Sequence, residues 1–209
     1  MTEYLDYFDA DYNYIGKTER NEIYNKGLWY HTFDCLIVNN GKLIIQLRSK
    51  FKKRSPNLLD ISAGGHIQAG ESVIDGGIRE IKEELGLNVI ENDLKYLGYY
   101  KIATDKNKVS RQFCHTYIMN NKVSVSDYKL QCEEVGGIFE LDIEEGRKLF
   151  LNKVEEIEIC GYLINEKNIF LPETRKVKIN DFKQRTPNYW LKVFNCVEDF
   201  IKGREYIYI

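Results

Sequence analysis

A segment that runs from Gly65 to Leu87 constrains this chain more than any other part of its sequence. It opens with a glycine, carries one early glutamate and ends in Arg-Glu-Ile-Lys-Glu-Glu-Leu-Gly-Leu. Glu80, Glu83 and Glu84 are spaced so that a helix places them on one face. Like charges one turn apart repel each other, and Mg2+ with its preference for oxygen ligands offsets that repulsion. The segment therefore predicts an acidic helix that holds a divalent metal ion.

The rest of the segment predicts how this helix is anchored and where it ends. Arg79 can pair with Glu83 across one turn or orient Glu80. Glu71 lies near the expected helix start, where the helix dipole favours a negative charge, and Gly86 suits a C-terminal stop. So many fixed positions argue against an ordinary solvated helix. An apolar stripe on another face would pack on a core: Ile74, Ile78, Ile81 and Leu85.

These residues resemble the Nudix box, Gly-x5-Glu-x7-Arg-Glu-U-x-Glu-Glu-x-Gly-U with U apolar, at every fixed position. The resemblance implies an α/β Nudix fold, an α/β/α sandwich around a mixed β-sheet, here with an N-terminal β-hairpin and a C-terminal helix. It also implies an enzyme, a pyrophosphohydrolase that uses Mg2+, or alternatively Mn2+, to cleave a nucleoside diphosphate derivative or a similar organic diphosphate.

The same resemblance assigns roles to single residues. Glu71 and Gly65 would brace the loop, and Arg79 would support the carboxylates that carry out catalysis. The base that activates water is either a box glutamate, Glu80 or Glu84, or a glutamate on a later loop. The implied metal ligands are a backbone carbonyl near Gly64 and the carboxylates of Glu80, Glu83 and Glu84.

The later loop offers two candidates for the base, Glu133 and Glu134. A strand ending near Leu130 would lead into this loop. We favour Glu134 because it directly precedes the apolar Val135, as in the family pattern. A solvated loop glutamate is the alternative.

The segment from His31 to His66 looks most like the Nudix branch that includes isopentenyl-diphosphate isomerase. The shared pattern is Gln-x-Arg-Ser-x3-Lys around Arg48 and Lys52, followed by Ser-Ala-Gly-Gly-His. It implies that Arg48 and Lys52 grip the substrate diphosphate, a task that suits the planar fork of Arg. A solvated basic loop is the alternative for both. His66 either contacts phosphate or holds the glycine loop.

The chain departs from the isomerase at its catalytic positions. Gly64 stands where the catalytic cysteine would be, and Tyr24 and Cys132 replace two metal ligands. Proton transfer at carbon needs an acid and a base on opposite sides of the substrate, and glycine supplies neither. The hydrolase relatives of this branch are the better match. An isomerase-like enzyme and a non-catalytic nucleotide sensor are the alternatives, although such sensors usually lose box glutamates.

Composition narrows the partners. The net charge of −2 gives no reason to expect nucleic acid or an anionic membrane as a partner. The N-terminus shows no basic-then-apolar signal region, so we expect a cytoplasmic protein. The partner that the Nudix resemblance implies is a small organic diphosphate. The five cysteines are scattered and read as reduced. The hairpin and the C-terminal helix are candidate homodimer contacts. The expected division is 1–28 as an extension, 29–165 as the hydrolase domain and 166–209 as a packed C-terminal extension.

Local patterns place the remaining elements. Asn39-Asn40-Gly41 predicts a hairpin turn. Thr186-Pro187 reads as the start of a C-terminal helix. His31 and His115 read as structural residues. The expected strands and helices cover Tyr4–Phe8, Tyr14–Gly16, a short helix from Thr18 to Asn25, Trp29–Val38, Lys42–Leu47, Leu58–Ser62, 94–102, 109–119, Gly136–Leu141, Ile143–Phe150, Ile157–Ile164, Ile169–Leu171, and a helix whose apolar face is Trp190, Val193, Phe194, Val197 and Ile201.

Overall fold

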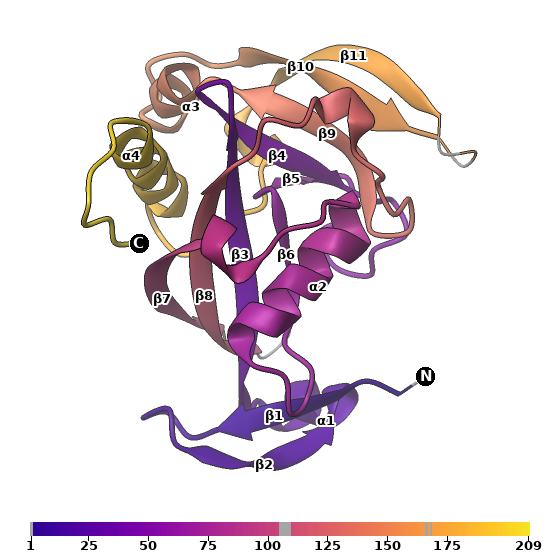
Figure 1. Ribbon diagram of the computed structural model, residues 1–209, viewed down its shortest axis with the longest axis vertical. Coiled ribbons are helices and arrows are strands. Elements are labelled where there is room, and N and C mark those ends of the chain that lie inside the picture. Colours follow the sequence, from indigo (N-terminus) through magenta and orange to yellow (C-terminus); the bar gives the residue numbers. More distant parts are fainter. Residues whose placement is uncertain (1, 105–109, 166, 168) are drawn as a thin grey trace.

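A mixed β-sheet lies between helices on its two faces in the computed structural model, which describes residues 2–104, 110–165, 167 and 169–209. Helix α2 (Val73–Leu85) covers one face, and α3 (Ile143–Phe150) and α4 (Tyr189–Ile201) cover the other (Figure 1). The predicted α/β/α sandwich is thus confirmed. The strands are β1 Tyr4–Phe8, β2 Tyr14–Glu19, β3 Trp29–Asn39, β4 Lys42–Arg48, β5 Leu59–Asp60, β6 Ala63–His66, β7 Lys95–Thr104, β8 Ser110–Asn120, β9 Val135–Leu141, β10 Ile157–Ile164 and β11 Phe170–Val177.

Strand β3 is the centre of the sheet. It pairs in parallel with β8 along one edge, while β1, β6 and β4 pair with it antiparallel. The predicted turn after Asn39 is confirmed, because Asn40 and Gly41 both adopt positive φ angles, 48° and 78°, as a tight hairpin requires. The glycine loop is a correction: the expected single strand over 58–62 is β5, and the glycines themselves form β6.

Two apolar cores lie on the two faces of β3. Phe33 and its alternate neighbours pack with Ile81 and Leu85 of α2, whereas Leu36 packs on the α4 side. The approach of α2 is close: a Cβ on Gly77 would lie 2.2 Å from the Phe33 ring. The sheet thereby fixes the position of the acidic helix.

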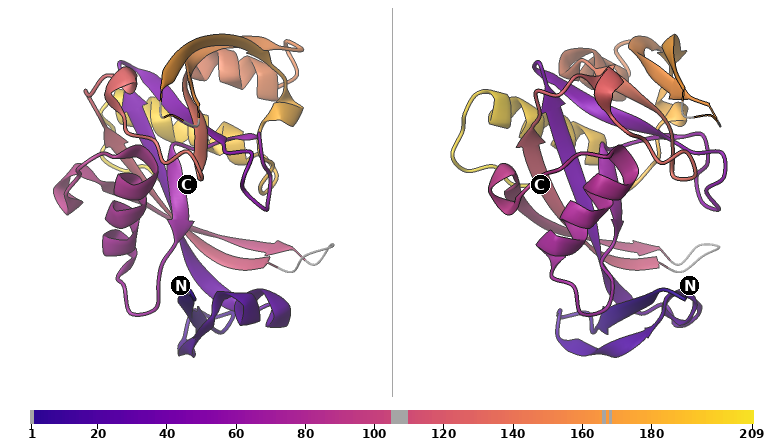
Figure 2. Two further views of the ribbon diagram at one scale, coloured as in Figure 1. Left: turned by 90° about the vertical axis from the view of Figure 1, so that its right-hand side faces the viewer. Right: turned by 45° about the vertical axis from the view of Figure 1, so that its right-hand side comes forward.

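The N-terminal extension continues the sheet. β1 and β2 form the predicted hairpin, and Tyr7 of β1 pairs with Tyr30 of β3. The short helix α1 (Arg20–Lys26) follows and ends at Gly27, which has a positive φ of 62°. Figure 2 shows these elements at the bottom of the molecule, below the glycine strand β6.

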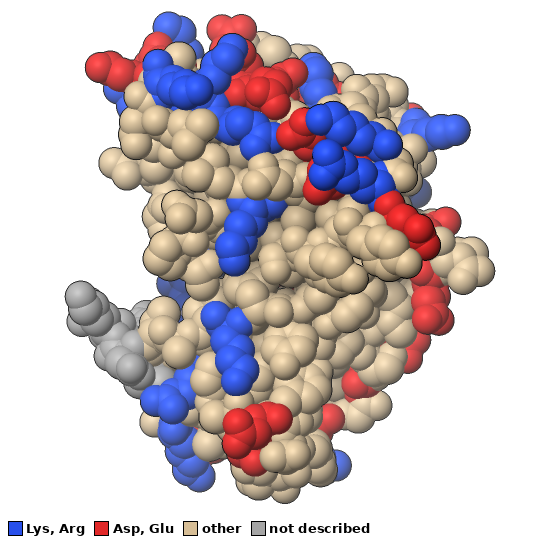
Figure 3. Space-filling model, turned by 90° about the vertical axis from the view of Figure 1, so that its left-hand side faces the viewer, with Lys and Arg blue, Asp and Glu red and all other residues tan. Residues whose placement is uncertain are grey.

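The C-terminal extension covers the other face. Helix α4 begins at Tyr189, not at Thr186-Pro187 as expected, because Asn188 has a left-handed conformation and the Tyr189 amide donates to the Thr186 carbonyl in a turn. The predicted apolar face is buried except for Ile201, which is 46% exposed. Figure 3 shows both signs of charge near the top of this side and a largely uncharged middle. Within the described residues, no helix is long and apolar enough to cross a membrane.

Candidate active site

The acidic helix has defined ends. The Ser72 hydroxyl accepts the amide of Asp75 as an N-cap, and Gly86 ends the helix with a φ of 68°. Both ends agree with the sequence prediction. The helix dipole therefore starts beside Glu71, and the box glutamates lie in its later turns.

Arg79 is the hub of the polar contacts on this helix. Its guanidinium makes two hydrogen bonds to Glu71, at 2.8 and 3.0 Å, and one each to Glu80 and Glu83, at 2.9 and 3.0 Å. It also donates to the carbonyl of His66 at 3.0 Å. The two bonds from Arg79 hold the pKa of Glu71 below its usual value. Arg79 thus joins the glycine strand, the helix start and two box carboxylates.

The three glutamates, which were expected on one face of the helix, are not equally exposed. The Glu83 side chain is 51% exposed and that of Glu80 is 15% exposed, whereas Glu84 is buried. Glu84 accepts the Gly64 amide at 3.1 Å and the Gln46 side chain at 3.0 Å. The helix therefore turns one carboxylate into the protein, against β4 and β6.

Negative charge in this corner is incompletely compensated. Burial, together with the neighbouring charge of Glu80, raises the pKa of Glu84 to about 7. Burial also raises the pKa of Glu80, although Arg79 opposes that rise. A divalent cation beside these two carboxylates would offset the cost of burying them.

The donor set fits a hard divalent cation. It consists of carboxylates and backbone carbonyls, the oxygen ligands that such cations prefer. The Glu80 carboxylate lies directly against the backbone of Gly65, since a Cβ there would be 2.1 Å from its carboxyl carbon. The carboxylates do not yet converge: in the described part of the chain, no three Asp, Glu, His or Cys side chains are grouped closely enough to ligate one ion. Glu83, which is half exposed and accepts from Arg79, is the third box carboxylate on this side of the helix.

Arg48 and Lys52, at the start of the basic loop between β4 and β5, make different kinds of contact. Arg48 donates to the carbonyls of Ser55 and Arg54, at 3.0 and 3.1 Å, and lies 3.4 Å from Asp60. Arg48 thus braces its own loop, whereas the resemblance led us to expect that it grips the substrate diphosphate. Lys52 instead forms an ion pair with Glu134, and the charges of Glu84 and Glu80 act on it. Lys52 is the basic residue that faces the box.

The segment that leads to Glu134 differs from the one expected from the sequence. The expected strand near Leu130 is absent from the described residues; β8 ends at Asn120 and an irregular segment follows. The Gln131 amide of this segment donates to the backbone carbonyl of Glu84 at 3.1 Å, which docks it on the end of α2. Glu134 then pairs with Lys52, whereas Glu133 is exposed.

The histidines are held by other side chains. The hydroxyl of Tyr24 lies 2.9 Å from His66 Nε2, and burial lowers the pKa of His66 well below its usual value. His31 stacks on Phe8 at 4.0 Å, and His115 lies within hydrogen-bond distance of two tyrosines. These contacts match the structural roles expected of His31 and His115, and they favour loop holding for His66.

Gly64 leaves no space for the side chain that an isomerase would need there. A Cβ at this position would lie 2.8 Å from the Phe33 carbonyl oxygen and 3.1 Å from an Asp34 carboxyl oxygen. The backbone around this glycine is therefore built for a residue without a side chain.

A buried ionic network behind the glycine strand escaped the sequence analysis. Arg185 of the C-terminal extension contacts Asp34 at 2.6 Å and Asp60 at 2.8 Å, and Lys183 contacts Asp60 at 2.7 Å. Tyr100 also donates to Asp34, at 2.9 Å. The sequence does contain one indication of this network, because Asp34 is a charged residue in the middle of an apolar strand.

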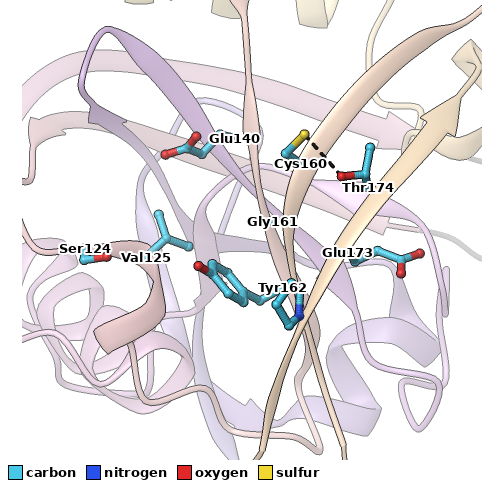
Figure 4. Close-up of a pocket in the computed structure, with 9 residues that line it drawn as sticks. Ser124, Val125, Glu140, Cys160, Gly161, Tyr162, Glu173 and Thr174 are labelled. Atoms are coloured by element: carbon cyan, nitrogen blue, oxygen red, sulfur yellow. Dashed lines mark hydrogen bonds between the residues drawn. The ribbon is translucent and has the colours of Figure 1, made fainter.

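One cavity, of about 380 Å3, lies apart from all of these residues. Figure 4 shows it between β9, β10 and β11 and the turn at Ser124, with Tyr162 and the thiol of Cys160 along its wall. None of the expected site residues lines it. We therefore assign the site to the box helix and not to this cavity.

Comparisons with known proteins agree on the family. A model of the NUDIX domain matches residues 30–156. An uncharacterized Nudix hydrolase of Clostridium acetobutylicum is 36% identical over 94% of this chain and 98% of its own length. The isopentenyl-diphosphate Delta-isomerase of Serratia proteamaculans is 29% identical over 56% of this chain and 66% of its own length.

A solved structure supports the fold. The crystal structure of DR0079 from Deinococcus radiodurans has a TM-score of 0.55 and 23% identity, and the match covers 68% of this chain and 85% of that one. Members of the matched family are generally pyrophosphohydrolases that depend on divalent metal ions. The chain belongs to the Nudix family, and it is a pyrophosphohydrolase.

Proposed function

We propose that this chain uses Mg2+, with Mn2+ as an alternative, to cleave the diphosphate bond of a nucleoside diphosphate derivative or a similar organic diphosphate. The observation that carries the proposal is the buried Glu84, whose carboxylate is held by the Gly64 amide and Gln46 beside a second, partly buried glutamate, Glu80. Arg79 contacts Glu80, whereas Glu84 accepts only from neutral donors, and protein interiors rarely keep a charged carboxylate in that situation.

In this proposal, Glu80, Glu83, Glu84 and the Gly64 carbonyl hold the metal ion. When bound, Mg2+ neutralises phosphate charge and lowers the pKa of a water molecule. Arg79 orients Glu80 and Glu83 through the contacts described above. A carboxylate takes the proton from water, and the supported candidates are Glu80, Glu84 and Glu134.

Lys52 offsets charge on the departing phosphate in this proposal. It already faces the box acids, and its ion pair with Glu134 exchanges for one with phosphate when substrate binds. Arg48 supports the same loop from within. The pattern from Arg48 to His66 supports an origin in the isomerase-like branch, without its reaction.

We also propose the division into an extension at 1–28, a hydrolase domain at 29–165 and a packed extension at 166–209, in a cytoplasmic protein that forms a homodimer through the hairpin or α4. The decisive experiment for function is a panel of nucleotide, dinucleotide and prenyl diphosphates with Mg2+ and Mn2+, assayed for phosphate products. Binding without any product release would indicate a sensor and contradict the proposal.

A further inference from the structure

Four side chains from three separate segments meet beside the glycine strand, and we call them the Tyr24 cluster: Arg20 and Tyr24 of α1, Arg54 of the basic loop, and His66 of β6. The Arg20 Nε donates to the Tyr24 hydroxyl at 3.1 Å, and that hydroxyl lies 2.9 Å from His66 Nε2. The left view of Figure 2 shows the loop between β4 and β5 reaching down from the upper part of the molecule toward α1.

A closed circuit of polar contacts fixes this cluster. Arg20 contacts one oxygen of Glu3 at 2.7 Å, and His66 Nδ1 lies 3.5 Å from the other. With a neutral His66, the Tyr24 hydroxyl donates to Nε2 and accepts from Arg20, so each polar atom in the circuit has a partner. The circuit holds the Tyr24 ring in one orientation against the glycine strand.

Arg54 rests on that ring and differs from the other nearby cations. Its guanidinium carbon lies 4.2 Å from the centre of the Tyr24 ring. Arg20, Lys52 and Lys183 each contact a carboxylate. Among the described residues, no carboxylate lies within ion-pair distance of Arg54, so its positive charge is uncompensated.

The position of Arg54 relates it to the box. Lys52, two residues earlier on the same loop, faces Glu134 and the box acids. His66 follows Gly64 by two residues on the same face of β6, which is a distance of about 7 Å along a strand. A chain of linked phosphates with one end at the box can therefore reach the Tyr24 cluster at the other.

We propose that Arg54, held flat against Tyr24, binds the terminal, unesterified phosphate of the substrate. The inference rests on the proposed function and narrows its substrate class to organic diphosphates and triphosphates with a free phosphate end. Such a phosphate carries close to two negative charges and three acceptor oxygens, which suits a guanidinium fork without a carboxylate partner. The N-terminal extension, which lies outside the matched family domain, thereby becomes part of the substrate site.

The test compares two ligands with the metal chelated. ADP has a free terminal phosphate, whereas ADP-ribose has that phosphate esterified, and titration calorimetry in EDTA measures both. We expect the wild type to prefer ADP. Arg54→Gln should weaken ADP binding about tenfold or more and leave ADP-ribose binding almost unchanged. Lys53→Gln, an exposed neighbour on the same loop, is the matched control and should change neither.

Tyr24 provides an independent arm. Tyr24→Phe keeps the ring under Arg54, so it should lose less ADP affinity than Tyr24→Leu, which removes the ring. Equal losses in Arg54→Gln and Lys53→Gln, or no ADP preference in the wild type, would overturn the inference. Hydrolysis with Mg2+ is measured separately: Glu83→Gln should abolish turnover and keep the ADP preference, so failure of the proposed function is distinguishable from failure of this inference.

Discussion

Two pairs of acidic side chains lie on opposite sides of the central strands, and the protein neutralises them differently. Asp34 and Asp60 on the α4 side receive Arg185, Lys183 and Arg48. On the α2 side, Glu84 has a backbone amide and Gln46 as its hydrogen-bond donors. The pKa of Asp60 is held below its usual value by these cations against the effect of burial, whereas burial raises that of Glu84 to about 7.

The difference separates a structural site from the site that we propose to bind a cation. A buried carboxylate with its own arginine is already satisfied and stabilises one arrangement of the chain. A buried carboxylate without one depends on a partner from solution. By this criterion Glu84 is the acid that we propose for the functional site, whereas Glu80 beside it already contacts Arg79.

The largest expected effect is on the paired side. Arg185→Met should lower the free energy of unfolding by about 3–5 kcal/mol, because Asp34 and Asp60 remain buried without their shared partner. Urea denaturation measures the change, with the exposed Lys192→Met on α4 as the control. A loss below about 1 kcal/mol would mean that the network is not structural.

The unpaired side should respond in the opposite sense. Glu84→Gln should lower kcat about a hundredfold or more, because it removes a proposed metal ligand and candidate base. The same change should raise the melting temperature of the metal-free protein, since an amide is cheaper to bury than a carboxylate. Scanning calorimetry in EDTA and a turnover assay measure the two effects, with the exposed Glu158→Gln as the control. Destabilisation together with full activity would reverse our assignment of the two pairs.

Glu134 sharpens the comparison because its cation, Lys52, also experiences the charges of Glu84 and Glu80. Glu134→Gln should lower kcat about ten- to a hundredfold with a smaller change in KM if the residue acts in the transition state. Glu133→Gln, its exposed neighbour, should retain the wild-type rate. If Glu133→Gln is impaired instead, the role shifts by one residue; if neither changes, the base lies in the box.

A smaller effect is expected in the pH dependence of stability. The raised pKa of Glu84 means that the metal-free folded protein binds more protons than the unfolded chain between about pH 4.5 and 7. Its stability should therefore fall by about 1–3 kcal/mol as the pH rises through that window. Asp60 has the opposite sign: its contribution is complete above about pH 4 and is lost as the pH falls. Denaturation at a series of pH values in EDTA gives the free energy of unfolding against pH. The slopes of this plot for wild type and Glu84→Gln should differ only between about pH 4.5 and 7.

The smallest expected effect is no reaction at all. Incubation with isopentenyl diphosphate and Mg2+ should yield no dimethylallyl isomer, because Gly64 carries no acid or base and the surrounding backbone leaves no room for one. Product analysis by chromatography decides this point. Clear isomer formation would contradict our reading of Gly64.

Local signals explain why so much of the fold could be predicted. Ser72 and Gly86 mark the ends of α2, and Asp142 caps α3 by accepting two backbone amides, so these helices follow from a few neighbouring residues. The same kind of signal failed at Thr186-Pro187, where the left-handed Asn188 delays the helix. Propensity placed the start of this helix too early because the turn before it is set by a single residue.

Burial of the candidate site residues did not follow from their spacing. Helical spacing places Glu80, Glu83 and Glu84 near one another, but it does not say which of them turns inward against β6. Nor does spacing reveal that Arg48 braces its own loop, since its partners are carbonyls of that loop and Asp60. The burial of Glu84 depends on contacts with residues distant in the sequence, whereas the partners of Arg48 depend on how its loop folds back on itself.

The contact between Arg185 and Asp34 joins residues that are 151 positions apart. At translation rates of 5–20 residues per second, Arg185 emerges roughly 8–30 s after Asp34. During that interval the carboxylates of Asp34 and Asp60 have no counter-charge from the tail and must stay hydrated. The α4 side of the sheet can therefore be completed only after Arg185 and α4 have been synthesised.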